Sequence, residues 1–204
     1  FLNQAGYAIV DFDETGLATQ KRYRPFGASV SESRWKIPLS IKFKLNGKIQ
    51  VSNHLLESDK LQLRRIKDAD WYLPVANGNG YFRWSVPEKQ YRALIEDLES
   101  LSDREKMAVL SNSKGLLDAG EISIGDHLRL LQQMAKANSP DVFYFTVGEL
   151  KQIGQAYIGP ENKTGYNAYI TSTLTPWFNQ IGIRSRSGDS ETLLRLRPWL
   201  LRTL

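Results

Sequence analysis

The chain has 204 residues, of which 41% are hydrophobic and 24% are charged, a balance typical of a folded protein and not of a disordered one. It contains no cysteine, which excludes disulfide bonds, cysteine-ligated metal sites and thiol nucleophiles. No apolar run approaches the roughly 20 residues that a membrane-spanning helix needs. The formal net charge is +5, and the whole excess lies in residues 1–87, with 13 Lys and Arg against 8 Asp and Glu. Because these basic residues are dispersed and residues 88–204 are neutral, the charge argues against nucleic-acid binding.

Residues 1–87 have the patterns of short strands. Residues 7–10 form an apolar run, and apolar and polar residues alternate over residues 37–43, as in a half-buried strand. Asn46-Gly47 favours a tight hairpin turn, after which Ile49, Val51 and Leu55 return on a second strand. Further strands are predicted over residues 61–66 and 81–84. Seven or so short strands with turn residues between them predict a β-sandwich.

From Pro87 onward the apolar period changes from two to about 3.6, the period of amphipathic helices. Leu94, Leu98 and Leu101 share one helical face. Ser102 and Glu105 have the spacing of a capping box, which predicts the start of a second helix. Gly120 ends that helix and Ser123 opens a third. The core face of the third helix is expected to consist of Ile124, Leu128, Leu131 and Ala135.

Three more helices follow in the pattern. Ser139-Pro140 combines a cap with a first-turn proline, and it precedes the stripe Phe143, Val147, Leu150 and Tyr157. The next stripe is Ile170, Leu174, Trp177 and Ile181, in a helix that Pro176 is expected to kink or break. A last helix from about Asp189 carries Leu193, Leu196 and Leu200. We therefore predict a multi-domain β-plus-α protein, with a β-sandwich over residues 1–87 and an antiparallel helical array over residues 88–204.

The two histidines do not have the spacing of a metal site. His54 lies in a predicted strand and has no second histidine one helical turn away, as an H-E-x-x-H zinc site requires. His127 lies near the start of a predicted helix, where we expect it to be partly exposed. Composition alone leaves a serine–histidine–aspartate site open, but no G-x-S-x-G turn supports one.

Three other motifs invite a functional interpretation. Asn77-Gly78-Asn79-Gly80 is glycine-rich, as phosphate loops are, but a strand and not a helix is predicted after it, which favours a flexible turn. The acidic run Glu96-Asp97-Glu99 is expected on the solvent side of a helix. Arg184 and Arg186 flank a serine in a predicted loop, where they could bind an anion. The tightest basic group, residues 64–67, is followed at once by two aspartates.

A series of short phrases along the chain is more informative than any of these motifs. In the first half the phrases are Phe1-Leu2-Asn3-Gln4-Ala5-Gly6-Tyr7, Gln20-Lys21-Arg22-Tyr23, Trp35-Lys36-Ile37-Pro38, Trp71-Tyr72-Leu73-Pro74 and Asn77-Gly78-Asn79-Gly80-Tyr81-Phe82-Arg83-Trp84. In the second half they are Asp103-Arg104, Leu110-Ser111-Asn112 and Ala119-Gly120-Glu121-Ile122-Ser123. In this order, and over the whole chain, they resemble the C-terminal part of the aminopeptidase N family of zinc metallopeptidases, the gluzincins.

The resemblance implies a four-part enzyme. An N-terminal β domain and a thermolysin-like domain with the zinc ligands come first, followed by a small β-sandwich and a long helical domain that closes over the active site. This chain would match the third part and the first helices of the fourth. No position here matches the family's zinc ligands, base glutamate, amine-binding glutamate or transition-state tyrosine. No catalytic or metal-binding residue is therefore assigned, and residues that bind substrate stay unknown.

Two functions of different classes follow. The first is a non-catalytic portion of a zinc-dependent aminopeptidase that releases N-terminal amino acids from peptides, with this segment positioning the catalytic domain and shaping the substrate chamber. Zinc would be a cofactor of the parent enzyme only, and the partners would be the N-terminal and catalytic domains of the same polypeptide and the peptide substrate. The alternative is a free-standing module that binds a protein or peptide. A third reading, a nucleic-acid adaptor, would show affinity that falls steeply with salt.

The end of the sequence carries one further expectation. Because the chain stops on a leucine-rich helix, we expect a fragment whose last apolar stripe lacks part of its cover. Leu193, Leu196, Trp199 and Leu200 would then be exposed in part, and the terminus would either fray or pack against a second copy in weak self-association.

Overall fold

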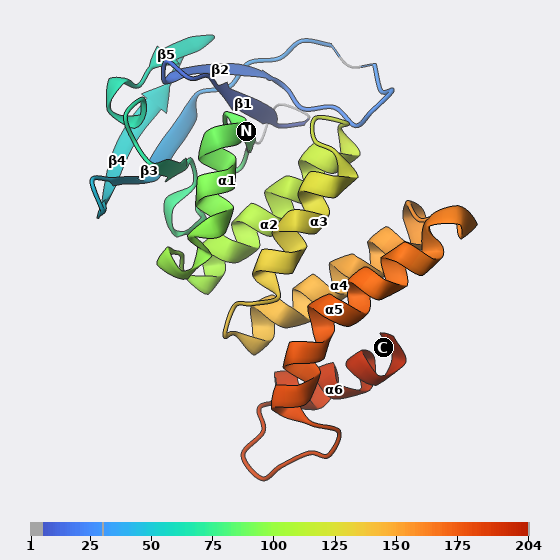
Figure 1. The fold of residues 1–204 in the computed structure, drawn as a ribbon. Coiled ribbons are helices and arrows are strands. Elements are labelled where there is room, and N and C mark those ends of the chain that lie inside the picture. Colours follow the sequence, from blue (N-terminus) through green and yellow to red (C-terminus); the bar gives the residue numbers. More distant parts are fainter. Residues whose placement is uncertain (1–5, 30, 204) are drawn as a thin grey trace. The chain divides into compact units, whose positions relative to one another are not determined.

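The computed structural model describes residues 6–29 and 31–203 (Figure 1). Residues 1–5, which carry most of the first family phrase, lie outside the described residues. In the described part, seven strands form two sheets and are followed by six α-helices, which confirms the predicted β-plus-α architecture. The chain divides into two compact units at His127 and Leu128. The predicted domain boundary between residues 87 and 88 differs from this division and stays a prediction. It falls where the strands give way to helices, since the last strand ends at Ser85 and the first α-helix begins at Glu88.

The first sheet has four strands in the order β5-β2-β1-β7. These are β1 (Ala8–Phe12), β2 (Leu17–Arg22), β5 (Lys60–Gln62) and β7 (Arg83–Ser85). β1 pairs in antiparallel with β2 and in parallel with β7. The parallel pairing is possible because some seventy residues of chain, including the whole second sheet, separate the two strands.

The second sheet has three strands in the order β4-β3-β6, which are β3 (Ile37–Leu45), β4 (Lys48–Leu56) and β6 (Trp71–Leu73). Asn46 and Gly47 adopt the positive φ angles of 50° and 73° that the tight β3–β4 turn requires. The alternation over residues 37–43 is confirmed, because every second side chain of that run is buried. The two sheets meet where the rings of Phe12 and Tyr72 lie edge to face, with centroids 5.6 Å apart.

Residues 61–66 differ from the prediction of one strand. The strand ends at Gln62, and residues 64–66 form a short 3₁₀ turn, η1 (Arg64–Ile66). The apolar residues Leu63 and Ile66 are buried three positions apart, which suits a helical turn, whereas a strand would place them on opposite faces. β2 and β6 were not predicted as strands, because β2 is mostly polar and β6 is only three residues long.

The helices of the first unit are α1 (Glu88–Glu96) and α2 (Asp103–Asp118), separated by the 3₁₀ turn η3 (Leu98–Ser100), and α3 (Ile124–Met134) begins there. The predicted capping box is present, since Ser102 and Glu105 each hydrogen-bond to the other's backbone N–H. In α2, the buried Asn112 accepts from the backbone N–H of Trp84 at 2.9 Å and donates to the carbonyl of Trp84 at 2.8 Å. The amide side chain thus completes the hydrogen bonding of β7 and joins α2 to the first sheet.

The second unit contains α4 (Pro140–Ala156), the 3₁₀ turn η4 (Pro160–Asn162), α5 (Lys163–Ile181) and α6 (Glu191–Thr203). In Figure 1, α4 and α5 run side by side, and α6 packs against both. The stripe predicted in α5 is buried, and the rings of Phe143 and Trp177 stack with centroids 4.3 Å apart. Pro176 lies inside α5 without ending it, on the exposed face of the helix and opposite the buried stripe.

The last helix corrects the expectation of an uncovered stripe. Leu196 and Leu200 are fully buried against the other helices of the second unit. The buried Arg197 donates to the carbonyls of Ile181 and Gly182 and pairs with Asp189 at 2.7 Å, so it ties α6 to the end of α5. Because Leu196 and Leu200 are buried within the chain, they do not supply the exposed apolar surface from which we predicted self-association.

Candidate functional site

The outward face of β3 is the best-defined polar site of the first unit. Its lysines, Lys42 and Lys44, follow the alternation of the predicted half-buried strand and so fall on its polar side. In the structure, the turn η3 and the start of α2 cover this face. Lys42 Nζ lies 2.8 Å from Glu105 Oε2 and 2.9 Å from the carbonyl oxygen of Ser100. Lys44 Nζ lies 2.7 Å from Asp97 Oδ2. We call these two ion pairs and their hydrogen-bond partners the strand–helix joint.

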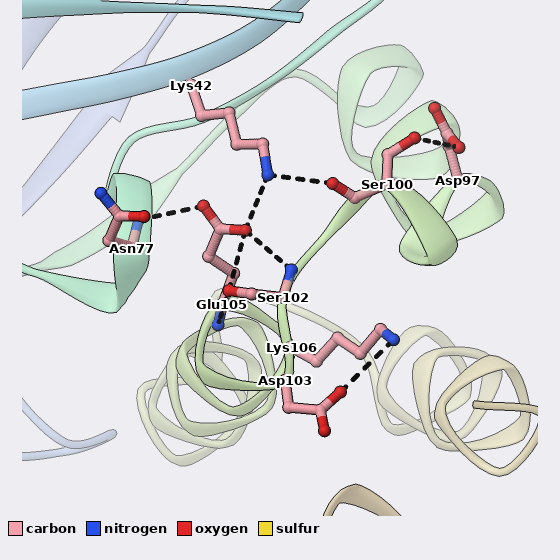
Figure 2. Close-up of polar contacts among 8 residues, drawn as sticks. All are labelled: Lys42, Asn77, Asp97, Ser100, Ser102, Asp103, Glu105 and Lys106. Carbon is pink, nitrogen blue, oxygen red and sulfur yellow. Dashed lines mark hydrogen bonds and ion pairs between the residues drawn. The ribbon is translucent and has the colours of Figure 1, made fainter. Parts of the chain in front are cut away.

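Glu105 is the centre of the joint, and only 2% of its surface is exposed (Figure 2). Besides Lys42, its carboxylate accepts from the backbone N–H of Asn77 at 2.9 Å and from the backbone N–H of Ser102 at 2.9 Å. The hydroxyl of Ser102 lies 3.1 Å from the same carboxylate. The one side chain therefore joins β3, the turn after β6 and the first turn of α2.

These contacts set the protonation state of Glu105. Burial by itself would raise the pKa of the carboxyl group, but the hydrogen bonds from Lys42 and from the backbone of Asn77 and Ser102 outweigh it and lower the pKa below its ordinary value. A general base needs an available lone pair and a path to substrate. Glu105 has donors at both oxygens and almost no exposed surface, so its chemistry is that of a structural anion.

Asp97 forms the second anchor of the joint. It accepts from Lys44, from the indole N–H of Trp71 at 2.8 Å and from the hydroxyl of Ser100 at 2.7 Å. Burial raises the pKa of Asp97, and these three donors lower it by more, so the net shift is downward. The prediction of a solvated acidic run holds for Glu96 and Glu99, which are exposed, and is wrong for Asp97.

The glycine-rich stretch after β6 belongs to the joint. Residues 76–78 form the 3₁₀ turn η2 (Ala76–Gly78), in which Asn77 and Gly78 have φ angles of 57° and 67°. A β-carbon at Gly78 would lie 3.0 Å from the carbonyl oxygen of Arg104, so the close approach of the turn to α2 requires glycine. Asn79 accepts from Arg104 at 2.9 Å. The predicted turn is present, and Asn77, Gly78 and Asn79 in it contact Arg104 or Glu105 at the start of α2.

An exposed apolar stripe lies directly beside the joint on β4. Ile49, Val51 and Leu55 alternate along the outward face of this strand and remain 45%, 53% and 48% exposed. Val51 is opposite Lys42 and Ile49 is opposite Lys44 in the β3–β4 register. β4 is also an edge of its sheet, paired only with β3 among the described strands. The stripe thus combines exposed apolar side chains with a sheet edge that no other described strand pairs, and both features occur at docking surfaces.

The histidines do not contribute to a metal site. His54 Nε2 lies 3.0 Å from Ser52 Oγ on the same strand. His127 was expected to be partly exposed, but it is fully buried, and its Nδ1 lies 2.8 Å from Ser113 Oγ. Of the predicted core face of α3, Leu131 and Ala135 are buried, whereas Ile124 and Leu128 are only partly so, and His127, Leu130 and Met134 complete the buried face. Ser113 and His127 are both inaccessible, so they do not form a nucleophile–base pair that substrate could reach.

A zinc site does not fit the part of the chain that the structure describes. Within residues 6–29 and 31–203 no group of three or more histidine, aspartate or glutamate side chains is placed to hold a metal ion. In the same residues no helix is both long enough and apolar enough to cross a membrane.

The two basic groups noted in the sequence lie at the surface. Arg64 and Arg65 are exposed beside a small surface pocket near His54, and Arg184 and Arg186 are exposed in the loop between α5 and α6.

Together the features define two small sheets, the second of which is joined by ion pairs to the helix α2 and to Asp97 beside η3, with an exposed apolar stripe on β4. Residues 71–204 match the family described as the ERAP1-like C-terminal domain, and the chain belongs to that family. The predicted resemblance to the C-terminal part of the aminopeptidase N family is thereby confirmed.

A relative extends the match over almost the whole sequence. The chain is 21% identical over 202 residues to the protein named Tricorn protease-interacting factor F2 of Thermoplasma volcanium. The aligned region covers 97% of this chain and 24% of that protein. The chain therefore spans about a quarter of the length of this curated relative.

Proposed function

We propose that the chain is the C-terminal portion of a zinc-dependent aminopeptidase that releases N-terminal amino acids from peptides. Its own role in this proposal is to position the catalytic domain and to shape the substrate chamber. Zinc and the groups that act on the peptide bond would belong to the rest of the polypeptide. Membership of the ERAP1-like C-terminal domain family and the small share of the longer relative that this chain covers support the proposal.

The observation that carries the positioning role is the apolar stripe of β4 beside the strand–helix joint. Three side chains of this size, each about half exposed, leave apolar surface in water that a partner domain would cover at a gain of roughly 1 kcal/mol each. The joint holds β3, and with it β4, against α2 through fully hydrogen-bonded charges. A domain docked on the stripe would therefore be held at a fixed orientation to the helices.

The test uses the full-length polypeptide, assayed for hydrolysis of an aminoacyl reporter and for bound zinc. The variant Val51→Glu/Leu55→Glu places two charges on the stripe, and Val51→Ile/Leu55→Met keeps the stripe apolar as a matched control. We expect the full-length protein to hold zinc and to turn over the reporter. We expect kcat/KM to fall about ten- to hundredfold in the charged variant, as a small misplacement of catalytic groups does, and to stay within about twofold in the control.

Two results would contradict the proposal. If the isolated 204-residue chain bound zinc stoichiometrically after dialysis, or cleaved the reporter in a chelator-sensitive way, the catalytic centre would lie in this chain. If the full-length charged variant kept full activity and unfolded with the same midpoint as the apolar control, the stripe would not position another domain.

A further inference from the structure

A groove in the second unit has the composition of a binding site that the proposed function does not use. It has a volume of about 550 Å³, within the rough range of 300–1,000 Å³ typical of small-molecule sites. Its lining comes from α4, η4 with the loop before it, α5 and α6. The apolar part consists of Val147, Leu150, Ile158, Ile170 and Trp199.

The cations of the groove outnumber the carboxylates near it. Lys151, Lys163 and Arg202 belong to its lining and no aspartate or glutamate does, although the carboxylate of Glu161 lies beside the lining residue Gly159. All three cations are exposed, and we call them the rim of the groove. None of the three forms an ion pair with another described residue. Three cations against the neighbouring carboxylate of Glu161 leave an excess of positive charge, which attracts an anion to this rim.

We propose that the groove binds a fatty acid, with the carboxylate at the three cations and the acyl chain along the apolar lining. The ligand would be an anion attached to an apolar body, because a simple anion would not cover Ile158 and Trp199, the partly exposed residues of the apolar lining. The cations supply charge-assisted hydrogen bonds to the carboxylate. Burial of the acyl chain supplies an affinity that grows with chain length.

The polar groups of the lining favour an acyl chain over a peptide. The hydroxyl of Tyr166 already donates to the carbonyl of Leu150, so Asn167 is the one neutral polar side chain of the lining that remains for a ligand. A peptide in the groove would bring several backbone amide groups against apolar side chains, and each unpaired amide costs free energy. An acyl chain has no such groups.

The experiment is isothermal titration of the chain with octanoate, decanoate and dodecanoate, each below the concentration at which it forms micelles. The variant Lys151→Ala/Lys163→Ala removes two rim charges at exposed positions. Lys89→Ala/Lys136→Ala removes two exposed lysines outside the groove and has the same net charge. Decanol and decyltrimethylammonium test the head group, and circular dichroism checks that each variant is folded.

We expect one decanoate per chain and an affinity that rises about two- to fourfold with each methylene that stays in the groove. The rim variant should weaken decanoate binding about tenfold and leave decanol binding unchanged, whereas the control should change neither by more than twofold. Decyltrimethylammonium should not compete with decanoate.

Four results would overturn the proposal. The first is no binding of any of the three fatty acids, and the second is equal binding by the rim variant and its control. The third is binding of inorganic phosphate as tight as that of decanoate with no dependence on chain length, which would define a simple anion site. The fourth is tighter binding of an apolar peptide with a free carboxyl terminus, lost when that terminus is amidated, which would define a peptide site. Each result concerns residues 147–202 and leaves the proposed role of β4 untouched.

Discussion

Replacement of Glu105 by alanine should destabilise the first unit more than replacement of Asp97, the other carboxylate of the joint, by alanine. The change leaves Lys42 with only the carbonyl of Ser100, and it removes the acceptor of the backbone N–H groups of Asn77 and Ser102. Because Glu105 is only 2% exposed, water would reach these donors poorly after the carboxylate is removed.

The expected magnitude follows from the burial of the pair. Removal of one partner from a buried ion pair costs about 3–5 kcal/mol. Because the side chain of Lys42 is 14% exposed and regains some hydration, we expect the lower end, about 3 kcal/mol. Glu105→Gln keeps the shape and one acceptor oxygen, but its NH2 faces a former donor, so it should cost only somewhat less, about 2–3 kcal/mol. Glu191→Ala, which removes a 79% exposed partner of Arg195, should cost at most about 0.5 kcal/mol.

Hydrogen exchange is the suitable assay, because two compact units need not unfold in one transition. The amides of β3 and of the first turn of α2 should exchange about a hundredfold faster in Glu105→Ala, as about 3 kcal/mol implies. The amides of α4 and α5 should be unchanged. Exchange in β3 that matched the Glu191→Ala control would show that the joint does not stabilise this unit, and the reasoning from burial would be wrong.

Two further predictions concern the same unit. Both Glu105 and Asp97 have lowered pKa values, so the stability they contribute is fully present above their ordinary values of 4.5 and 3.8 and is lost as the pH falls through the lower folded values. Urea midpoints from pH 7 to pH 3 should show this loss, and Glu105→Gln should flatten the curve at its acidic end; an unchanged curve would contradict the pKa assignment. Asn112→Leu leaves the N–H and carbonyl of Trp84 without partners and should cost about 2–4 kcal/mol. The exposed substitution Asn179→Leu should stay within about 0.5 kcal/mol, and equal urea midpoints for the two variants would contradict the bridging role.

The elements that the sequence predicted well are those with local signals. The β3–β4 hairpin follows from Asn46-Gly47 between two alternating segments, and the start of α2 follows from Ser102 and Glu105 three positions apart. Each signal is complete within a few residues, so it needs no knowledge of the rest of the fold. β6 could not be predicted in the same way, since three buried residues become a strand only because β3 lies beside them.

The joint could be predicted only in part. The alternation of β3 placed Lys42 and Lys44 on the polar face correctly, but alternation cannot show whether that face meets water or another element. Asp97 appeared solvated for the same reason, because its partners Lys44 and Trp71 are distant in sequence. His127 was misplaced because the predicted stripe runs through the adjacent Leu128, which is only partly buried, and the helical period alone does not decide between two neighbouring positions.

The choice of charges over apolar side chains at the joint has a consequence for the proposed docking surface. Apolar residues of similar volume would hold β3 against α2 at least as firmly, since desolvation offsets much of the attraction in a buried ion pair. They would not fix the orientation as narrowly, however, because apolar contacts are not directional. Lys42 and Lys44 point to two different acceptors, Glu105 on α2 and Asp97 beside η3, from positions two residues apart on one strand. Two directional contacts on β3 fix the rotation of the strand about its own axis as well as its distance from α2. The stripe on β4, which pairs with that strand residue by residue, is thereby held in a defined relation to α2.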